Sequence, residues 1–450
     1  MKYKNFTELL DDMAGRFPQN PAIRFDRGGL QEMNYTELRA KVFGMAEQLK
    51  QDPCTCIGVY LPPCPEWVIT VMASAIAGKR TVLLDLSMNA ERLQLLVNAT
   101  GIDKIISYDP EKTDALTLAA TPDGPVEYGG HILFFTSGTT ALNKAVVISQ
   151  RALCSSAWNG QQCLPCNDKD TVLCVLPLNH VFGFVCAMFW PLNNGACVAF
   201  SRGIREMVED PKYFKPTIIS VVPTILNYFM ATNALNPELR CILIGASPCD
   251  EATFQAITAT GVEVRCGYGM TETASGLAMT PVGGDRLAMD LCPDTQVRIA
   301  EDGEVMIRTT CMMEGYFHDK ASTDAVLRGG ELATGDLGKL DENGRLLILG
   351  RKNDVLVLPN GEKVYCAEAE DELTKALGAE TALCLLDAKL TAVVSSPDLT
   401  EDAIRPKLEA WNKEQALGRR VLGLLVTAEQ LPKTATGKLQ RWKLQQMLAK

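Results

Sequence analysis

Histidine is scarce in this sequence, so metal sites built on it are hard to assemble. The three histidines, His131, His180 and His318, lie far apart along the chain. The 16 cysteines are scattered, and the single Cys-x-x-Cys motif, Cys163–Cys166, has no second pair of the kind that completes a structural zinc site. We therefore expect neither a zinc centre nor a disulfide scaffold, and we interpret most cysteines as small core residues of a cytoplasmic protein with reduced thiols.

Long apolar runs and an excess of positive charge are also missing. The most apolar region, residues 172–200, is interrupted by prolines, asparagines and a histidine, and falls short of the roughly 20 apolar residues that a membrane span needs. The opening MKYKNFTELLDD lacks the apolar core of a secretory signal. With 44 basic against 54 acidic side chains, the net charge of −10 argues against a general binder of nucleic acids or anionic membranes. We expect residues 172–200 to be buried interior.

What the chain does have is length and apolar content. Its 450 residues, 47% of them hydrophobic, indicate two or more domains. In the first half, helical patterns alternate with strand patterns; Asn34 and Glu37 resemble a capping box at the start of one such helix. Short β-rich runs occur at 56–61, 80–84, 104–107, 218–222 and 241–244. The alternation predicts layered α/β sheets.

From about residue 296 the pattern changes to short apolar segments separated by turn dipeptides. Asp302-Gly303, Asn343-Gly344 and Asn360-Gly361 accept the positive φ angles of hairpin turns. After Tyr365 the pattern is mixed again, and Leu439, Trp442 and Met447 have the spacing of a final amphipathic helix. We place a domain boundary in this hairpin-rich region.

The most informative segment is His131 to Val147, HILFFTSGTTALNKAVV. A short buried strand at 132–135 is followed by hydroxyls and a glycine, Thr136-Ser137-Gly138-Thr139-Thr140, and then by Lys144. Such a loop suits a polyphosphate, although a Ser/Thr-rich surface turn is the alternative. The P-loop pattern does not apply, because Asn143 precedes Lys144 and Ala145 follows it.

Four further segments follow in order: GYGMTET at 267–273, TGDLGKL with Asp336, ILGRKNDV with Arg351, and LPKTATGKLQR with Lys438. Together with the first loop they resemble the AMP-forming adenylating superfamily of acyl-CoA synthetases, peptide-synthetase adenylation domains and beetle luciferase. The resemblance covers nearly the whole chain. It implies an α/β fold in which a large ATP- and acyl-binding domain, 1–352, contains layered sheets and a β-subdomain. A small mobile α+β lid domain, 353–450, would follow.

The resemblance also implies a reaction. A carboxylate attacks the α-phosphorus of ATP to give an acyl-adenylate and pyrophosphate, and a thiol then displaces AMP. Both steps build negative charge on oxygen, which fixed positive charge stabilises. The implied phosphate contacts are Thr136, Ser137, Gly138, Thr139, Thr140 and Lys144 for the β and γ phosphates, and Thr271 for the α-phosphate. The remaining implied contacts are Glu272 for Mg²⁺, Gly267, Tyr268 and Gly269 around adenine, Asp336 and Arg351 for the ribose, and Lys438 between the carboxylate and the α-phosphate.

Each of these residues has a simpler alternative. Glu272 could cap a helix, Asp336 and Arg351 could pair with each other at the surface, Tyr268 could be core, and Lys438 could be solvated. His180, in LPLNHVFGF, resembles the acyl-pocket segment of the family, but an isolated histidine in an apolar run is also commonly a satisfied core residue.

Two features distinguish this chain from the usual family pattern. Ala141, Asn143 and Ala145 stand where the phosphate loop usually has glycine or proline, which changes its backbone entropy more than its charge. Asn353 stands at the family's hinge, where Asp or Lys is usual. The resemblance implies that the lid carrying Lys438 closes for adenylation and swings away for thiol attack.

The substrate is partly readable. The expected pocket comprises His180 to Phe184, Pro223 to Leu226 and Gly245-Ala246-Ser247, and it lacks the aspartate that meets an amino acid's ammonium group. We therefore expect an aliphatic or aromatic carboxylic acid, with coenzyme A as the acceptor; an aryl-succinyl ligase of the menaquinone pathway is one subclass. The alternatives are a stand-alone adenylating enzyme that loads an acyl carrier protein, and a non-catalytic nucleotide-binding member.

Overall fold

Two structural units make up the protein. Unit 1 comprises Met1–Gln296 and Arg308–Leu332, and unit 2 comprises Val297–Ile307 and Ala333–Lys450. The structure is a computed structural model that describes residues 3–114, 116–122, 126–136, 144–358, 363–386, 389–415, 419–433 and 439–448.

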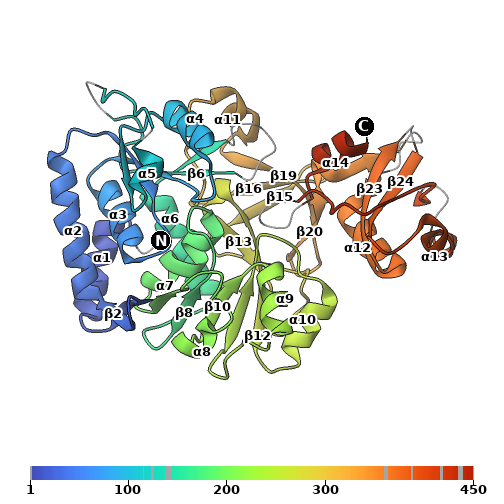
Figure 1. The fold of residues 1–450 in the computed structure, drawn as a ribbon, viewed down its shortest axis with the longest axis horizontal. Coiled ribbons are helices and arrows are strands. Elements are labelled where there is room, and N and C mark those ends of the chain that lie inside the picture. Colours follow the sequence, from blue (N-terminus) through green and yellow to red (C-terminus); the bar gives the residue numbers. More distant parts are fainter. Residues whose placement is uncertain are drawn as a thin grey trace. The chain divides into compact units, whose positions relative to one another are not determined.

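A nine-stranded sheet forms the larger half of unit 1, in the order β14-β13-β12-β11-β10-β8-β9-β1-β2 (Figure 1). The six central strands, from β12 to β1, are parallel, whereas the outer neighbours pair antiparallel. The strands are β1 (Pro21–Asp26), β2 (Leu30–Asn34), β8 (Thr171–Cys174), β9 (Cys197–Phe200), β10 (Ile218–Val221), β11 (Cys241–Ile244), β12 (Glu263–Met270), β13 (Ser275–Met279) and β14 (Asp290–Leu291).

A second sheet of unit 1 has the order β17-β7-β6-β4-β3-β5. Strands β3, β4, β5 and β6 are parallel, and β7 and β17 add antiparallel neighbours. Every residue of β3, β4 and β6 is buried, as is typical of a parallel sheet covered on both faces. The strands are β3 (Cys56–Tyr60), β4 (Arg80–Leu83), β5 (Lys104–Ser107), β6 (Ile132–Phe135), β7 (Ala145–Ile148) and β17 (Gly315–Tyr316).

Helices pack around these sheets. They are α1 (Phe6–Arg16), α2 (Tyr35–Gln51), α3 (Pro65–Ile76), α4 (Ala90–Thr100), α5 (Pro110–Thr113), α6 (Gln150–Cys163), α7 (Trp190–Leu192), α8 (Asp210–Phe214), α9 (Pro223–Ala231), α10 (Glu251–Thr258) and α11 (Lys320–Val326). The predicted capping box of α2 is confirmed: the Asn34 side chain accepts from the Glu37 amide at 2.8 Å, and the Glu37 carboxylate accepts from the Asn34 amide at 3.0 Å.

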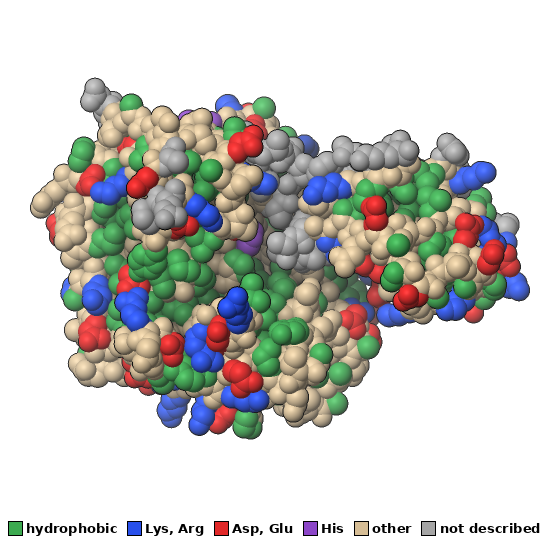
Figure 2. Space-filling view, in the orientation of Figure 1, with side chains coloured by type: hydrophobic (Ala, Val, Ile, Leu, Met, Phe, Trp, Pro, Cys, Tyr) green, Lys and Arg blue, Asp and Glu red, His purple; other side chains and the backbone are tan. Residues whose placement is uncertain are grey.

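Figure 2 shows Lys and Arg side chains interspersed with Asp and Glu on the visible face.

An aromatic cluster lies at the centre of unit 1. The ring of Phe184 is 5.2 Å from Phe134, 5.7 Å from Trp67 and 5.8 Å from Phe189, centroid to centroid. Phe184 and Phe189 belong to a seven-residue π-helix, Gly183–Phe189, within the apolar region that the sequence placed in the interior. That expectation is confirmed, and none of the described helices is long and apolar enough to cross a membrane.

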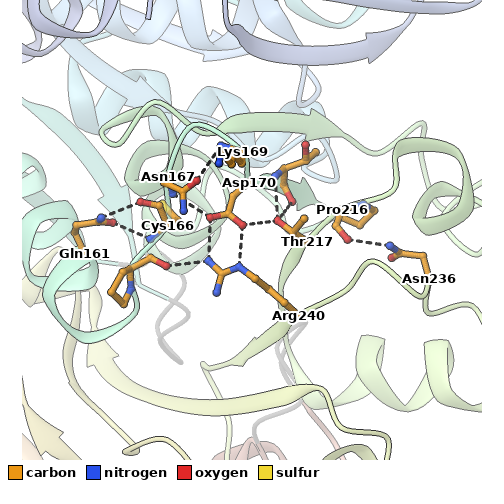
Figure 3. Close-up of polar contacts among 11 residues, drawn as sticks. Gln161, Cys166, Asn167, Lys169, Asp170, Pro216, Thr217, Asn236 and Arg240 are labelled. Atoms are coloured by element: carbon orange, nitrogen blue, oxygen red, sulfur yellow. Dashed lines mark hydrogen bonds and ion pairs between the residues drawn. The ribbon is translucent and has the colours of Figure 1, made fainter. Parts of the chain in front are cut away.

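A polar network ties three parallel strands together at their amino ends (Figure 3). Asp170, Thr217 and Arg240 are the residues that immediately precede β8, β10 and β11. Arg240 donates to both carboxylate oxygens of Asp170, at 2.8 and 2.9 Å, and the Thr217 hydroxyl donates to the same carboxylate at 2.7 Å. The network is structural, since it lies at the edge of the sheet opposite to the carboxyl ends of these strands.

Most of a further sheet belongs to unit 2. Its order is β15-β16-β19-β18, with β20 beside β19, and its strands are β15 (Gln296–Ile299), β16 (Glu304–Arg308), β18 (Leu327–Arg328, within unit 1), β19 (Glu331–Leu340) and β20 (Leu346–Arg351). The predicted turns at Asp302-Gly303 and Asn343-Gly344 are confirmed, with φ of +91° at Gly303 and +74° at Gly344. The Asn360-Gly361 turn lies outside the described residues, although β21 (Val355–Val357) and β22 (Lys363–Tyr365) pair antiparallel on either side of it.

The carboxyl-terminal part of unit 2 is α+β. Its three-stranded sheet contains β23 (Glu380–Leu386), β24 (Lys389–Ser395) and β25 (Gly423–Thr427), and its helices are α12 (Cys366–Leu377), α13 (Glu401–Lys413) and α14 (Arg441–Leu448). Arg441 donates to both oxygens of Glu370 at 2.8 Å, to Asp354 at 2.9 Å and to the Leu383 carbonyl at 3.0 Å. The predicted α/β fold class is confirmed. The predicted division into domains 1–352 and 353–450 stays a prediction, because it was defined by the expected motion of the second domain as a lid.

Candidate active site

Several predicted site residues lie at the carboxyl edge of the nine-stranded sheet. His180 follows β8, Gly245-Ala246-Ser247 follow β11, and Gly267 to Gly269 form the end of β12. In parallel α/β sheets ligands bind at this edge, because the loops there converge above the strand ends. The topology therefore brings together segments that are widely separated in the sequence.

Gly245 is required by the close packing of Phe182. A Cβ atom at position 245 would meet the Phe182 ring at 2.7 Å, so a larger residue would displace that ring. The next residue, Ala246, has a φ of +66°, a left-handed conformation that is strained for a side chain with a Cβ. Two segments predicted to form the acyl pocket, 180–184 and 245–247, are thus packed against each other.

His180 is half-buried in this pocket segment. Its backbone carbonyl accepts from the Phe184 amide at 2.9 Å at the start of the π-helix. Burial lowers the pKa of the imidazole, and the charge of Asp85 only partly offsets this effect. A neutral ring suits an apolar pocket, so His180 fits the acyl-side role better than that of a cation.

The turn after β12 is tightly constructed. A Cβ atom at Gly269 would lie 1.8 Å from the Ser275 carbonyl oxygen, and both Ala274 and Ser275 have positive φ, +47° and +93°. The Thr273 hydroxyl donates to the carbonyls of Met270 and Ser275, each at 3.1 Å. Strained backbone of this kind persists where the surroundings fix it, and it is common at functional sites. Thr271 and Glu272 lie on this turn.

Glu272 does not cap a helix. It is only 8% exposed, and its Oε1 accepts a hydrogen bond of 2.8 Å from the Tyr316 hydroxyl. Its backbone carbonyl accepts from the Met313 amide at 2.8 Å. Tyr316 comes from β17 of the other sheet and is 7% exposed. Sequence reasoning missed Tyr316, because a strand of two residues has no readable periodicity.

Lys144 contacts the same tyrosine. Its Nζ lies 4.5 Å from the centroid of the Tyr316 ring, a cation–π geometry. The Lys144 carbonyl accepts from the Thr136 amide at 3.1 Å and closes the β6–β7 ladder. The loop residues Ser137, Gly138, Thr139 and Thr140 lie outside the described residues. The two described ends of the predicted phosphate loop are therefore held together, with Lys144 beside Tyr316.

A single carboxylate can bind a metal that arrives with a nucleotide, because the phosphates supply further ligands. Within the described ranges no group of three or more His, Cys, Asp or Glu side chains is arranged to hold a metal ion. Mg²⁺ in phosphate-transfer sites is usually held by one or two carboxylates together with substrate phosphates and water. Glu272, with one oxygen engaged by Tyr316, fits that partial ligand set.

In unit 2, Asp336 and Arg351 are cross-strand partners on β19 and β20. The Nε of Arg351 lies 2.7 Å from Asp336 Oδ1, so the ion pair that the sequence offered as an alternative does form. The Asp336 amide also donates to the Thr334 hydroxyl at 3.0 Å. The Asp336 carboxylate is buried, whereas the Arg351 guanidinium is half-exposed. The pair therefore differs from an ordinary surface ion pair, in which both charged groups are exposed.

Lys438 lies outside the described residues, and only its surroundings are known. Lys433 and Leu439 form an isolated antiparallel bridge around residues 434–438, and Lys433 also pairs with Glu380. The backbone of Asn353 belongs to a 3₁₀ turn, Lys352–Asp354. The catalytic role of Lys438 and the hinge role of Asn353 stay predictions.

Comparison with known proteins agrees with the resemblance in the motifs. The model of the AMP-binding enzyme family matches residues 10–128 and 130–317. A 2-succinylbenzoate–CoA ligase of Listeria monocytogenes serotype 4b (strain F2365) is 28% identical over 84% of this chain and 83% of its own.

Two solved structures show the same fold over nearly the whole chain. One is O-succinylbenzoate coenzyme A synthetase from Bacillus subtilis in complex with ATP and magnesium ion, with a TM-score of 0.81, 24% identity, and coverage of 97% of this chain and 99% of that one. The other is the anthranilate CoA ligase AuaEII in complex with anthranoyl-AMP, with a TM-score of 0.83, 20% identity, and coverage of 100% and 98%. Because the family model matches more than half of the residues, and the fold and motif order agree with it, this chain belongs to the AMP-binding enzyme family.

Proposed function

We propose that this protein activates a carboxylic acid with ATP and transfers the acyl group to the thiol of coenzyme A. The Listeria relative is a CoA ligase by name, and the family to which this chain belongs is that of AMP-binding enzymes, which supports acid–thiol ligation of the acyl-CoA type. The observation that supports it best within the molecule is the arrangement around Tyr316. There the carboxylate of Glu272 accepts a hydrogen bond from the Tyr316 hydroxyl, and the ammonium group of Lys144 lies over the Tyr316 ring.

The first half-reaction needs charge control in unit 1. A substrate carboxylate oxygen attacks the α-phosphorus, and the bond to pyrophosphate breaks. We assign Lys144 to the β and γ phosphates, Thr271 to the α-phosphate and Glu272 to Mg²⁺, which when bound neutralises charge on the phosphates. The rigid turn from Gly269 to Ser275 fixes the backbone of Thr271 and Glu272 before the nucleotide binds, which lowers the cost of ordering the site.

The remaining assignments concern residues of unit 2. We assign Asp336 to the ribose hydroxyls and Arg351 to the same sugar. The buried carboxylate accepts hydrogen bonds strongly because it is ionised, and Arg351 compensates its charge. Lys438 is assigned to the substrate carboxylate and the α-phosphate. In the second half-reaction the thiol of coenzyme A attacks the acyl carbon and AMP departs.

The acyl substrate is proposed as an aromatic or aliphatic acid. Phe182 and Phe184 lie in the pocket segment, Gly245 gives Phe182 its space, and His180 is held toward neutrality by burial. No charged residue occurs between Val181 and Val185 to meet an ammonium group. The first acid to assay is 2-succinylbenzoate, the substrate in the name of the Listeria relative.

Pyrophosphate exchange across a panel of acids tests the proposal. The panel should contain 2-succinylbenzoate, benzoate, anthranilate, medium-chain fatty acids and amino acids. We expect acid-dependent exchange with an aryl or alkyl acid, and formation of its CoA thioester without any carrier protein. Exchange followed by transfer only to a carrier protein would favour the carrier-loading alternative. ATP binding without exchange for any acid would favour the non-catalytic alternative.

A further inference from the structure

We propose that Tyr316 is a positioning residue that sets the separation between the metal-binding carboxylate and the phosphate-binding lysine. The inference rests on the roles proposed above for Glu272 and Lys144, and it adds a residue to which the sequence motifs gave no function. Tyr316 uses two different parts of its side chain: the hydroxyl donates to Glu272 Oε1 at 2.8 Å, and the ring contacts Lys144 Nζ, 4.5 Å from its centroid.

The hydroxyl orients a carboxylate that has little water around it. Glu272 is 8% exposed, and a buried carboxylate needs hydrogen-bond donors to remain in one orientation. Among the described residues Tyr316 is the one side chain with a hydrogen bond to this carboxylate. Fixing Oε1 leaves Oε2 for a ligand, which is how an outer group orients a metal-binding carboxylate.

The ring restrains a side chain that would otherwise be free to move. Lys144 is exposed and immediately precedes β7, and a lysine has a flexible four-carbon stem. The face of an aromatic ring attracts an ammonium group by about 0.5–1 kcal/mol at exposed sites. Tyr316 therefore biases Lys144 toward one position without neutralising its charge, which remains available to phosphate oxygens.

The backbone of Tyr316 is itself fixed to the strand that carries Lys144. Tyr316 is paired with Val146 in the β17–β7 ladder, and the Phe317 amide donates to the Ala145 carbonyl at 2.8 Å. On its other side, the Tyr316 amide donates to the Thr323 hydroxyl at 2.9 Å. Glu272, by contrast, follows a strand of the nine-stranded sheet. Tyr316 thus contacts both charges that the proposed chemistry requires, Glu272 through its hydroxyl and Lys144 through its ring.

Tyr316→Phe tests the hydroxyl alone. We expect Mn²⁺, used as the spectroscopic substitute for Mg²⁺, to bind the enzyme–ATP complex about 10-fold more weakly by electron paramagnetic resonance titration, as for other groups that orient a metal ligand. The Mg²⁺ concentration for half-maximal pyrophosphate exchange should rise in parallel. Binding of AMP without metal should be unchanged.

Tyr316→Leu tests the ring. Metal-free ATP should bind about two- to fivefold more weakly relative to AMP, which lacks the β and γ phosphates, since a cation–π contact is lost. Tyr316→Phe should keep the wild-type ratio of ATP to AMP affinity. The matched control is Tyr35→Phe, because Tyr35 is also a buried tyrosine of unit 1, and its hydroxyl donates to the Ala196 carbonyl at 2.7 Å.

The variant Glu272→Gln distinguishes a failure of this inference from a failure of the proposed function. Glu272→Gln should weaken Mn²⁺ binding; if it does not, the proposed role of Glu272 fails and the inference fails with it. If Glu272→Gln weakens Mn²⁺ binding but Tyr316→Phe matches Tyr35→Phe, the positioning role alone is overturned. A loss of AMP affinity in Tyr316→Phe equal to the loss of metal affinity would also overturn it, because it would indicate general damage to the site.

Discussion

Arg351 and Asp336 form an ion pair whose two ends are very unequally exposed: the guanidinium side chain is 44% exposed and the carboxylate 4%, with 2.7 Å between Nε and Oδ1. The pair joins β19 to β20 within unit 2. Because the arginine carries the exposed end, the buried carboxylate is charge-compensated before any sugar hydroxyl reaches it.

Asp336→Asn should therefore weaken ATP use more than it weakens the fold. The substitution keeps the shape but loses the ionised acceptor, and hydrogen bonds to charged groups contribute about 1.5–3 kcal/mol. We expect kcat/KM for ATP in pyrophosphate exchange to fall about 10- to 100-fold. Lys352→Met is the control, since it removes a cation that pairs with Asp302 and Glu304 in the same unit. Equal losses in both variants would contradict the ribose assignment.

Lys438→Ala should separate the two half-reactions. Loss of one charge-stabilising donor lowers a rate by roughly 10²- to 10³-fold, and we expect this loss in adenylation only. Thioester formation from supplied acyl-adenylate should largely survive, as measured by release of CoA thioester in single-turnover experiments. Lys433→Ala is the control, because Lys433 already pairs with Glu380. Equal loss of both half-reactions would refute this division of labour.

Gly269→Ala should disrupt the turn that carries Thr271 and Glu272. Its Cβ would lie 1.8 Å from the Ser275 carbonyl oxygen, so β12 and β13 would have to move apart. We expect a lower Tm and at least a 10-fold loss of ATP affinity, because strain at this position displaces the site backbone. Gly276→Ala provides the control: Gly276 is the ladder partner of Gly269, and a Cβ there meets nothing within 4 Å. Similar behaviour of the two variants would contradict the packing argument.

The Asp170–Arg240 pair should give a pH-dependent contribution to stability. Burial of Asp170 raises the pKa of its carboxyl, but the hydrogen bonds from Arg240 and Thr217 outweigh burial and hold the pKa below its ordinary value. Since the folded pKa is depressed, the stabilisation is present above the unfolded pKa of about 4 and is lost as the pH falls through the folded value.

Arg240→Met should thus lower the free energy of unfolding by about 1–3 kcal/mol at pH 7, a range that is reduced because Arg240 is partly exposed. At pH 3.5 the loss of unfolding free energy should be clearly smaller. Urea denaturation at both pH values measures the difference. Arg39→Met is the control, because the Arg39–Asp11 pair is exposed at both ends. A loss that does not depend on pH would show that packing, and not the ion pair, is what Arg240 contributes.

Local patterns predicted much of this fold. The runs 104–107, 132–135 and 241–244 coincide with β5, β6 and β11, since β-branched and apolar residues bounded by turn residues determine them. The capping box of α2 was predictable for the same reason: its two residues are three positions apart. The AMP-binding family was predictable because five motifs occurred in order.

Contacts between distant segments could not be predicted in this way. Tyr316 and Glu272 are 44 residues apart, one on β17 and the other on the turn after β12, and Asp170 and Arg240 are 70 residues apart. Their pairing depends on how strands are ordered in space, which no local window contains. The pairing of Asp336 with Arg351 is intermediate: the sequence offered it as an alternative, and the ladder register decides it. The central phosphate loop and Lys438 lie outside the described residues, so their roles stay predictions.

The four hydrogen bonds of Arg441 have a consequence for recombining this chain with others. Arg441, the first residue of α14, bonds Asp354, which lies 87 positions earlier on the 3₁₀ turn that contains the predicted hinge, and it also bonds Glu370 of α12. The two ends of the segment 354–441 are thus fastened to each other. A hybrid enzyme whose carboxyl-terminal part comes from another family member would keep these partners together only if residues 354–441 all come from one parent. A crossover between Glu370 and Arg441 would leave the partly buried carboxylate of Glu370 facing a foreign residue in place of Arg441, and its cost would appear as misfolded protein before any change of substrate could be assayed.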